Sequence, residues 1–298
     1  TTYKEINGAN IEVVASDPSN PVEGQIWFNT TNNVVKGLFN DTAGSWSTGG
    51  ALNTGRYGGA SAGIQTAAFF AGGQKAPGLA NETELYNGTN WTEVNNINTS
   101  RRYFPGVGTT TAGLIFNGTP PDTGKTESYN GTNWTEVNDL NTARRGSAGA
   151  GTNTAALGFG GYAPPGQFKN ETELWNGTNW TEVNNLNTGR SYLAGAGTQT
   201  AALAFGGSAS GNDKNETEVW NGTNWTEVNN LNTARSKPGS AGTQTSALAF
   251  GGSADGLTAA TETWNGTNWT NVANMATARS LVGGAGASNT SGLVFGGD

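Results

Sequence analysis

The chain has 298 residues, with 47 glycines, ten tryptophans, no cysteine and no histidine, and its formal net charge is −7. The acidic balance argues against a nucleic-acid partner, because that binding needs Lys and Arg to neutralise phosphates. Without cysteine and histidine there are no thiolate nucleophiles, and the commonest general base and metal ligand is missing. We therefore expect no cofactor, no metal site and no enzyme, and no apolar run predicts a membrane span.

A repeat begins after the first 33 residues. The phrase ETELWNGTNWTEVNNLNTGR at 171–190 recurs with small changes at 82–101 and 216–235. Diverged copies lie at 126–144 and 261–279, and a worn first copy lies at 36–56. Each copy has a tryptophan followed ten residues later by an arginine, and then by a Gly-Gly pair (Asn-Gly once). The tryptophans are Trp46, Trp91, Trp134, Trp180, Trp225 and Trp269, and the arginines are Arg56, Arg101, Arg144, Arg190, Arg235 and Arg279.

Each period predicts four short strands. In one copy they are residues 191–199, 200–207, 216–222 and 224–228. The third and fourth strands meet at Asn-Gly, a strong hairpin signal because both turn residues tolerate positive φ. Four strands in about 45 residues is the period of a propeller blade. The expected fold is an all-β, six-bladed β-propeller of four-stranded blades.

The order of the strands predicts how the ring closes. The strands expected at 34–40 and around Trp46 are a third and a fourth strand, and those at 280–288 and 291–297 are a first and a second. We expect the N-terminal pair to join the C-terminal pair as a sixth blade, which leaves no free edge. The alternative is an open solenoid, which needs polar caps. The predicted domains are an anchoring or assembly segment at 1–33 and a propeller at 34–298.

The order of Arg, Gly-Gly, aromatic residue and Trp resembles the kelch motif over residues 34–298. The kelch tyrosine is tryptophan at Trp175, Trp220 and Trp264, and Asn117 replaces one glycine. The phrase NPVEGQIWFNTTNNVVKG at 20–37 resembles an N-terminal phrase of tail-fibre and related appendage proteins of tailed phages. The NGTNWTEV repeats are similar to those of virion proteins of marine and cyanobacterial phages. The resemblance implies a virion protein assembled in the cytoplasm of a bacterial host.

The repeated residues have two interpretations. The six tryptophans could stack on sugars, and the six arginines could form an anion-binding ring. A residue that every blade needs will also recur in every blade, so we favour an architectural role for both sets. Each tryptophan would then pack between blades, and each arginine would bind loop carbonyls or a glutamate such as Glu84, Glu173 or Glu218. We interpret the carboxylate pairs of the ETE phrases as a solvated strand face rather than acid/base groups.

The copies differ most in the loop after Gly-Gly and in the residues just after each arginine. Because strands alternate in direction, both regions emerge on one face of the disk, where a rigid scaffold displays binding residues. Neutral drift is the alternative, but it explains the loop lengths more easily than the aromatic residues. The candidate binding residues on this variable face are Tyr57, Arg102, Tyr103, Phe104, Tyr162, Phe168, Tyr192, Lys214 and Lys237.

The leading hypothesis is a non-enzymatic binding protein of a phage virion appendage, whose variable face contacts host-surface glycan or other virion proteins. The N-terminal segment could also join copies into a homo-oligomer. The alternative is a bacterial carbohydrate-binding lectin propeller with equivalent pockets in every blade, which would be extracellular. A glycan lyase or sialidase is a third hypothesis, disfavoured by near-identical blades without histidine.

Overall fold

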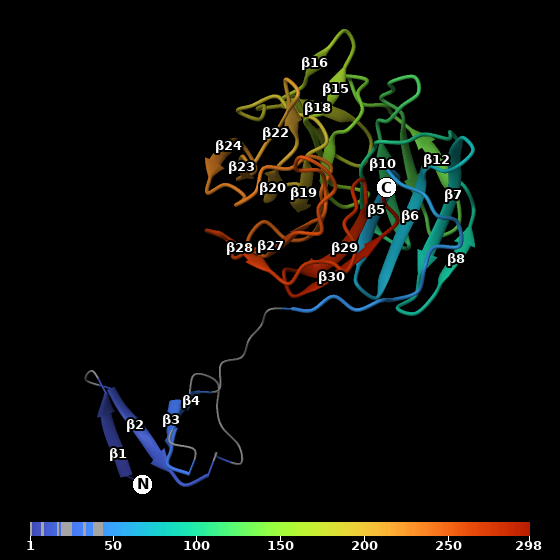
Figure 1. Cartoon of the computed structure of the whole chain (residues 1–298). Helices are drawn as coiled ribbons and strands as arrows, with labels where there is room; N and C mark the ends of the chain where they lie inside the picture. Colours follow the sequence, from blue (N-terminus) through green and yellow to red (C-terminus); the bar gives the residue numbers. More distant parts are fainter. Residues whose placement is uncertain (1, 7–8, 17, 19–25, 32–33, 38–43) are drawn as a thin grey trace. The chain divides into compact units, whose positions relative to one another are not determined.

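A computed structural model describes residues 2–6, 9–16, 18, 26–31, 34–37 and 44–298, drawn in Figure 1. The chain divides into two compact units, Thr1–Gly44 and Ser45–Asp298. No helix among the described residues is long and apolar enough to cross a membrane.

The first unit is a four-stranded sheet in the order β1-β2-β3-β4. Its strands are β1 (Thr2–Ile6), β2 (Ala9–Val14), β3 (Ile26–Asn29) and β4 (Val34–Gly37). Strands β2 and β3 are parallel, and the other pairs are antiparallel. Trp27 on β3 is buried. The anchoring role expected for 1–33 stays a prediction.

The second unit is an all-β propeller, as the repeat predicted, built around five four-stranded sheets. The first blade comprises β5 (Ala60–Ile64), β6 (Ala67–Gln74), β7 (Leu79–Tyr86) and β8 (Trp91–Val94). The second comprises β9 (Gly106–Thr109), β10 (Ala112–Phe116), β11 (Thr126–Tyr129) and β12 (Trp134–Val137). The third comprises β13 (Ala148–Gly151), β14 (Ala156–Phe159), β17 (Thr172–Trp175) and β18 (Trp180–Val183).

The last two blades follow the same plan. The fourth comprises β19 (Ala194–Gly197), β20 (Ala202–Phe205), β23 (Thr217–Trp220) and β24 (Trp225–Val228). The fifth comprises β25 (Gly239–Gly242), β26 (Ala247–Phe250), β27 (Thr261–Trp264) and β28 (Trp269–Val272). Two loops also contain short hairpins that the repeat did not predict, β15–β16 (Tyr162–Ala163 and Gln167–Phe168) and β21–β22 (Ser208–Ala209 and Asn212–Asp213).

The expectation of six four-stranded blades is wrong. The structure has five, together with a two-stranded sheet of β29 (Gly283–Ser288) and β30 (Ser291–Phe295). Of the residues expected at 34–40, Val34–Gly37 form β4, which pairs with β3 in the first unit. Residues 38–43 lie outside the described residues. Residues 45–59 contain no strand, only an isolated bridge at Tyr57.

The sequence of the diverged first copy, at 36–56, explains why it forms no regular third and fourth strand. It has neither the Asn-Gly turn nor the Thr-Glu pair that the third strands of the five blades share. The turn sets the register of a hairpin, so its loss removes the signal for a regular third and fourth strand. Some contacts of the repeat persist nonetheless, since Trp46 Nε1 donates to Thr261 Oγ1 at 3.2 Å.

The inner strands close the ring. Strand β29 contacts β25 on one side and β5 on the other, so the two-stranded sheet lies between the fifth and first blades (Figure 1). The Gly297 N–H also donates to the Arg56 carbonyl at 3.2 Å. The same bond joins the second glycine of every pair to the following arginine, as from Gly207 to Arg235 at 2.9 Å.

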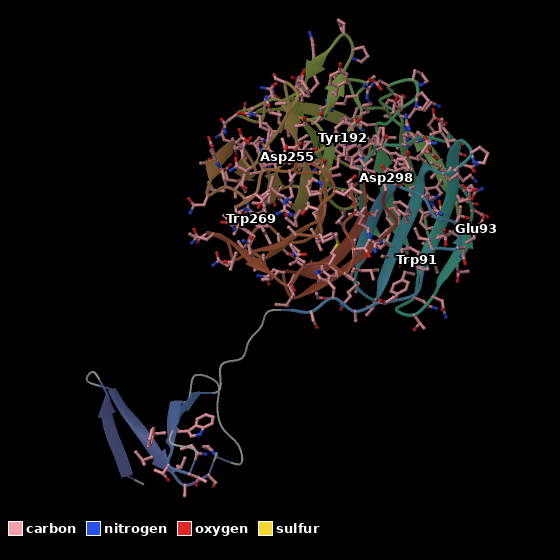
Figure 2. All side chains as sticks on the ribbon, in the orientation of Figure 1. Trp91, Glu93, Tyr192, Asp255, Trp269 and Asp298 are labelled. Atoms are coloured by element: carbon pink, nitrogen blue, oxygen red, sulfur yellow. The ribbon has the colours of Figure 1, made fainter. Side chains whose placement is uncertain are left out.

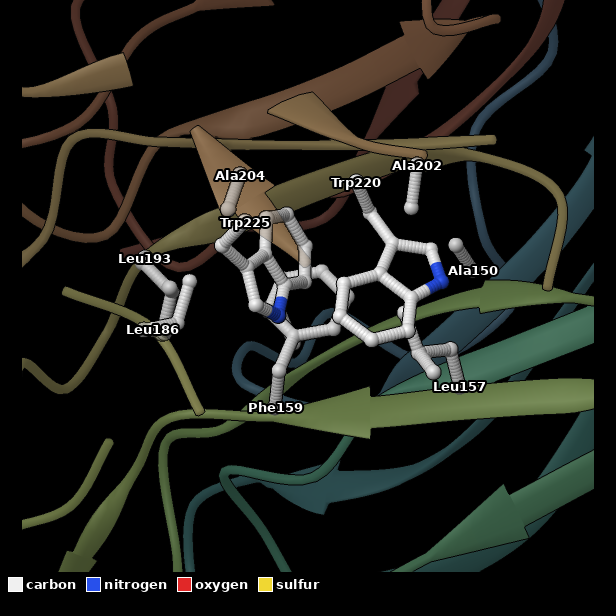
Figure 3. Packing of buried hydrophobic residues seen from close by; sticks show 10 residues of the cluster. Ala150, Leu157, Phe159, Leu186, Leu193, Ala202, Ala204, Trp220 and Trp225 are labelled. Atoms are coloured by element: carbon white, nitrogen blue, oxygen red, sulfur yellow. The ribbon is translucent and has the colours of Figure 1, made fainter. Parts of the chain in front are cut away.

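The core consists of thin layers between neighbouring blades. Figure 3 shows one of them, in which Phe159 of the third blade meets Trp225 of the fourth. Their ring centroids are 4.9 Å apart in an edge-to-face arrangement. The indole N–H of Trp225 donates to Thr172 Oγ1 of the third blade at 3.0 Å. Trp225 therefore joins its blade to the previous one, and its side chain is only 6% exposed.

Candidate functional site

Five of the repeated arginines form buried ion pairs within their own blade. Each precedes the first strand and reaches a glutamate on the third strand. The pairs are Arg56–Glu84, Arg101–Glu127, Arg144–Glu173, Arg190–Glu218 and Arg235–Glu262. The Arg190 Nη2 to Glu218 Oε1 distance is 3.0 Å. Burial lowers the pKa of Arg190, and the charge of Glu218 opposes that change.

The ETE phrases do not form a solvated face, so that expectation is wrong. The second glutamate of each phrase is the buried partner of the arginine, with Glu218 only 1% exposed. The first glutamate pairs with a lysine, as Lys214 does with Glu216 at 3.5 Å. Because these carboxylates are already neutralised by cations, they do not form an acid/base pair.

Arg279 differs from the other five arginines. The sheet that follows it has no third strand among the described residues, and Arg279 has no carboxylate partner there. Its Nη1 donates to the Gly296 carbonyl at 3.1 Å, and the residue is partly exposed.

A central cavity of about 240 Å³ lies among the inner strands. Its lining consists of glycine, alanine and serine, with a few proline, valine, leucine and phenylalanine residues, and so contains no ionisable side chain. General acid or base catalysis needs a titratable group within hydrogen-bond reach of the substrate. The cavity therefore offers packing and weak polar contacts rather than proton transfer.

The residue two positions after each repeated arginine adopts positive φ. We call these six residues the collar: Gly58, Tyr103, Gly146, Tyr192, Lys237 and Leu281, with φ between 53° and 65°. Each collar N–H donates to the carbonyl of the preceding collar residue, and Gly58 donates to Leu281, so that the bonds form a closed ring with N···O distances from 2.6 to 3.2 Å. The collar thus links every sector of the propeller through the backbone.

The collar surrounds a second pocket of about 110 Å³, which we call the mouth pocket. Tyr103, Tyr192 and Lys237 line it, together with Phe104, Leu281 and other uncharged residues. It shares Phe104 and several neighbours with the central cavity. In Figure 2, Tyr192 lies toward the middle of the disk, whereas Glu93 lies at its perimeter.

The two collar tyrosines form the centre of an aromatic and cationic group. Their ring centroids are 5.4 Å apart and the rings meet edge to face. The Arg102 guanidinium lies 4.6 Å from the Tyr103 ring centroid, and Lys237 Nζ lies 5.8 Å from that of Tyr192. Burial raises the pKa of Tyr103, although the Arg102 charge opposes this, so its phenol is neutral near pH 7.

The other candidate residues are more scattered. Phe104 is buried at 4% exposure beneath the mouth pocket, where its ring contacts Arg101. Tyr162 and Phe168 face each other across the β15–β16 hairpin at 5.5 Å. Lys214 is paired with Glu216, as described above. Tyr57 forms an isolated β-bridge with Gln74. Four further β-bridges of this kind likewise join the residue after a repeated arginine to the start of the loop after Gly-Gly.

Arg145 is a further residue of this face that the sequence pattern did not identify. Its Nη1 donates to both oxygens of Asp122, at 2.7 and 2.8 Å, and its guanidinium lies 4.7 Å from the Tyr162 ring centroid. The hydrogen bond to Asp122 raises the pKa of Arg145. The signal was its position, because Arg145 follows a repeated arginine as Arg102 does.

Neither protein-family models nor curated proteins give a match to this chain. The interpretation of the site therefore rests on its own residues.

Proposed function

We propose that this is a non-enzymatic binding protein of a tailed-phage virion appendage. Its propeller contacts host-surface glycan or another virion subunit through the face that carries the collar. The observation that carries the proposal is the mouth pocket, where two tyrosines and a lysine gather on one face. The virion assignment is supported by the phrase at 20–37 and the NGTNWTEV repeats.

The unequal collar favours a single recognition site. A lectin with a pocket in every blade would need the same side chain at each equivalent position. The six collar positions instead carry glycine twice, tyrosine twice, lysine and leucine. The central cavity, with no ionisable lining residue, supports a binding role over a catalytic one.

Mass spectrometry of purified virions tests the assignment. We expect peptides from this chain in the particles, and we expect excess free protein to slow adsorption of those particles to host cells. Peptides found only in the infected-cell lysate, with adsorption unchanged, would contradict the proposal.

A further inference from the structure

The mouth pocket is where positive charge is left without a counter-charge. In residues 45–298, which the structure describes in full, almost every Lys and Arg has a carboxylate partner. The exceptions are Arg102, Lys237 and Arg279. Two of these three cations, Arg102 and Lys237, lie beside the collar tyrosines. The protein as a whole carries a net charge of −7.

Neither of these two cations is neutralised by other nearby groups. Arg102 Nη1 donates to the neutral Gln74 Oε1 at 2.7 Å, and within residues 45–298 its buried Nε has no hydrogen-bond partner. Lys237 contacts the face of Tyr192. The charge of Asp298 acts on Tyr103, but within residues 45–298 Asp298 forms no ion pair with Arg102 or Lys237.

The backbone holds these side chains at a cost. Positive φ strains the backbone of an L-residue, whereas glycine adopts it freely. The chain uses glycine at Gly58 and Gly146, so glycine suits the collar geometry. Tyr103, Tyr192 and Lys237 adopt φ of 60°, 53° and 58° all the same. Strain retained where a relaxed residue is available points to a function for the side chain.

The shape of the pocket indicates the kind of ligand. The rings of Tyr103 and Tyr192 offer apolar faces for the C–H surface of a sugar and hydroxyls for its polar groups. Leu193, Pro238 and Val282 supply an apolar wall, and Ser147 adds one hydroxyl. A nucleic acid would need a longer cationic track than two side chains provide. The small volume of about 110 Å³ fits one sugar unit or part of one.

We propose that the mouth pocket binds a carboxylate-bearing sugar of an acidic surface polysaccharide. The carboxylate contacts Lys237, the sugar ring lies against Tyr103 and Tyr192, and Arg102 adds positive charge beside Tyr103. This inference rests on the proposed function, since it names the ligand class of the same face.

Immobilised polysaccharides test it. The full chain is passed over polygalacturonate, hyaluronate and polysialic acid, and over the same polymers with their carboxyl groups reduced to alcohols. We expect binding to at least one native polymer and a loss of about tenfold or more on its reduced form, because a hydrogen bond to a charged group is lost. Lys237→Gly and Tyr192→Gly should each weaken binding about tenfold, whereas Lys125→Ala, which removes a lysine paired with Glu136, should not.

The glycine variants also test the folding of the collar. Lys237→Gly removes the strain that Lys237→Ala keeps, so it should unfold at a higher temperature than the alanine variant. Equal or reversed unfolding temperatures would contradict the strain argument.

The outcomes separate the two proposals. Three results would overturn the acidic-sugar inference: equal binding to reduced and native polymers, full binding by Lys237→Gly, or no binding to any acidic polymer. If the protein still binds host cells, the proposed function stands. Failure to bind host cells together with absence from virions would overturn the proposed function itself.

Discussion

Replacing Arg190 by alanine is expected to lower the free energy of unfolding by about 3–5 kcal/mol, because it leaves Glu218 buried without its cation. Burial disfavours the charged form of a carboxyl group that has no cation beside it. Its ionisation opposes folding, so the loss should be smaller at about pH 5 than at about pH 8. Chemical denaturation at both pH values measures the effect.

Arg279→Ala is the matched control within the same chain. This arginine occupies the equivalent position but lacks a carboxylate partner among the described residues. Its removal should cost only about 1 kcal/mol, the contribution of an ordinary hydrogen bond. Equal losses of stability for the two variants would mean that the buried ion pair contributes no more to the blade than an ordinary hydrogen bond.

Trp225→Ala is expected to cost about 3–5 kcal/mol, the usual range for a large aromatic residue in a packed core. The substitution removes the ring that meets Phe159 and the donor to Thr172 Oγ1. Trp225→Phe keeps much of the packing and loses the hydrogen bond, so its cost should be about 1–2 kcal/mol. Thermal and denaturant unfolding of both variants measures these costs.

Trp46→Ala provides the comparison for the irregular sector. Trp46 makes the equivalent hydrogen bond and meets Phe250 at 5.3 Å, but it is partly exposed and lies outside any strand. Trp46→Ala should therefore lower the free energy of unfolding by less than Trp225→Ala does. A larger loss would show that residues 45–59 are as tightly packed as a regular blade.

The four-stranded blade could be predicted from the sequence because independent features of each repeat agreed. The Asn-Gly turn and the spacing of Trp and Arg indicated the same hairpins. The closure was not readable, because the worn first copy keeps Trp46 and Arg56 but lacks the turn and the glutamate. Tryptophan spacing alone therefore counted one four-stranded blade too many.

The collar could be predicted only in part. The variable positions after each arginine indicate Tyr103, Tyr192 and Lys237 as candidate binding residues. The residue types alone do not predict positive φ at a tyrosine or a lysine. The clue was Gly58 and Gly146 at two of the equivalent positions, since a glycine in a repeat often marks a backbone conformation that its counterparts must share. Asn117 is a parallel case, with φ of 68° where the other copies have glycine.

The sequence predicts an arginine partner for Glu218, as the structure has it, but it does not predict that the pair is buried. Alternation within a four-residue strand shows which residues share a face, but it does not show whether that face meets solvent or a loop. The structure places the Arg190 loop over the third strand, so the glutamate is covered by its own cation.

Hydroxyl-radical footprinting with host cell envelopes tests the central claim, that recognition occurs at the collar face. Tyr103 and Tyr192 report on the mouth pocket, and Ile64, which is 48% exposed at the β5–β6 turn, reports on the opposite face. We expect envelopes to slow the oxidation of the two tyrosines and to leave that of Ile64 unchanged. Protection of Ile64 with both tyrosines still reactive would contradict it.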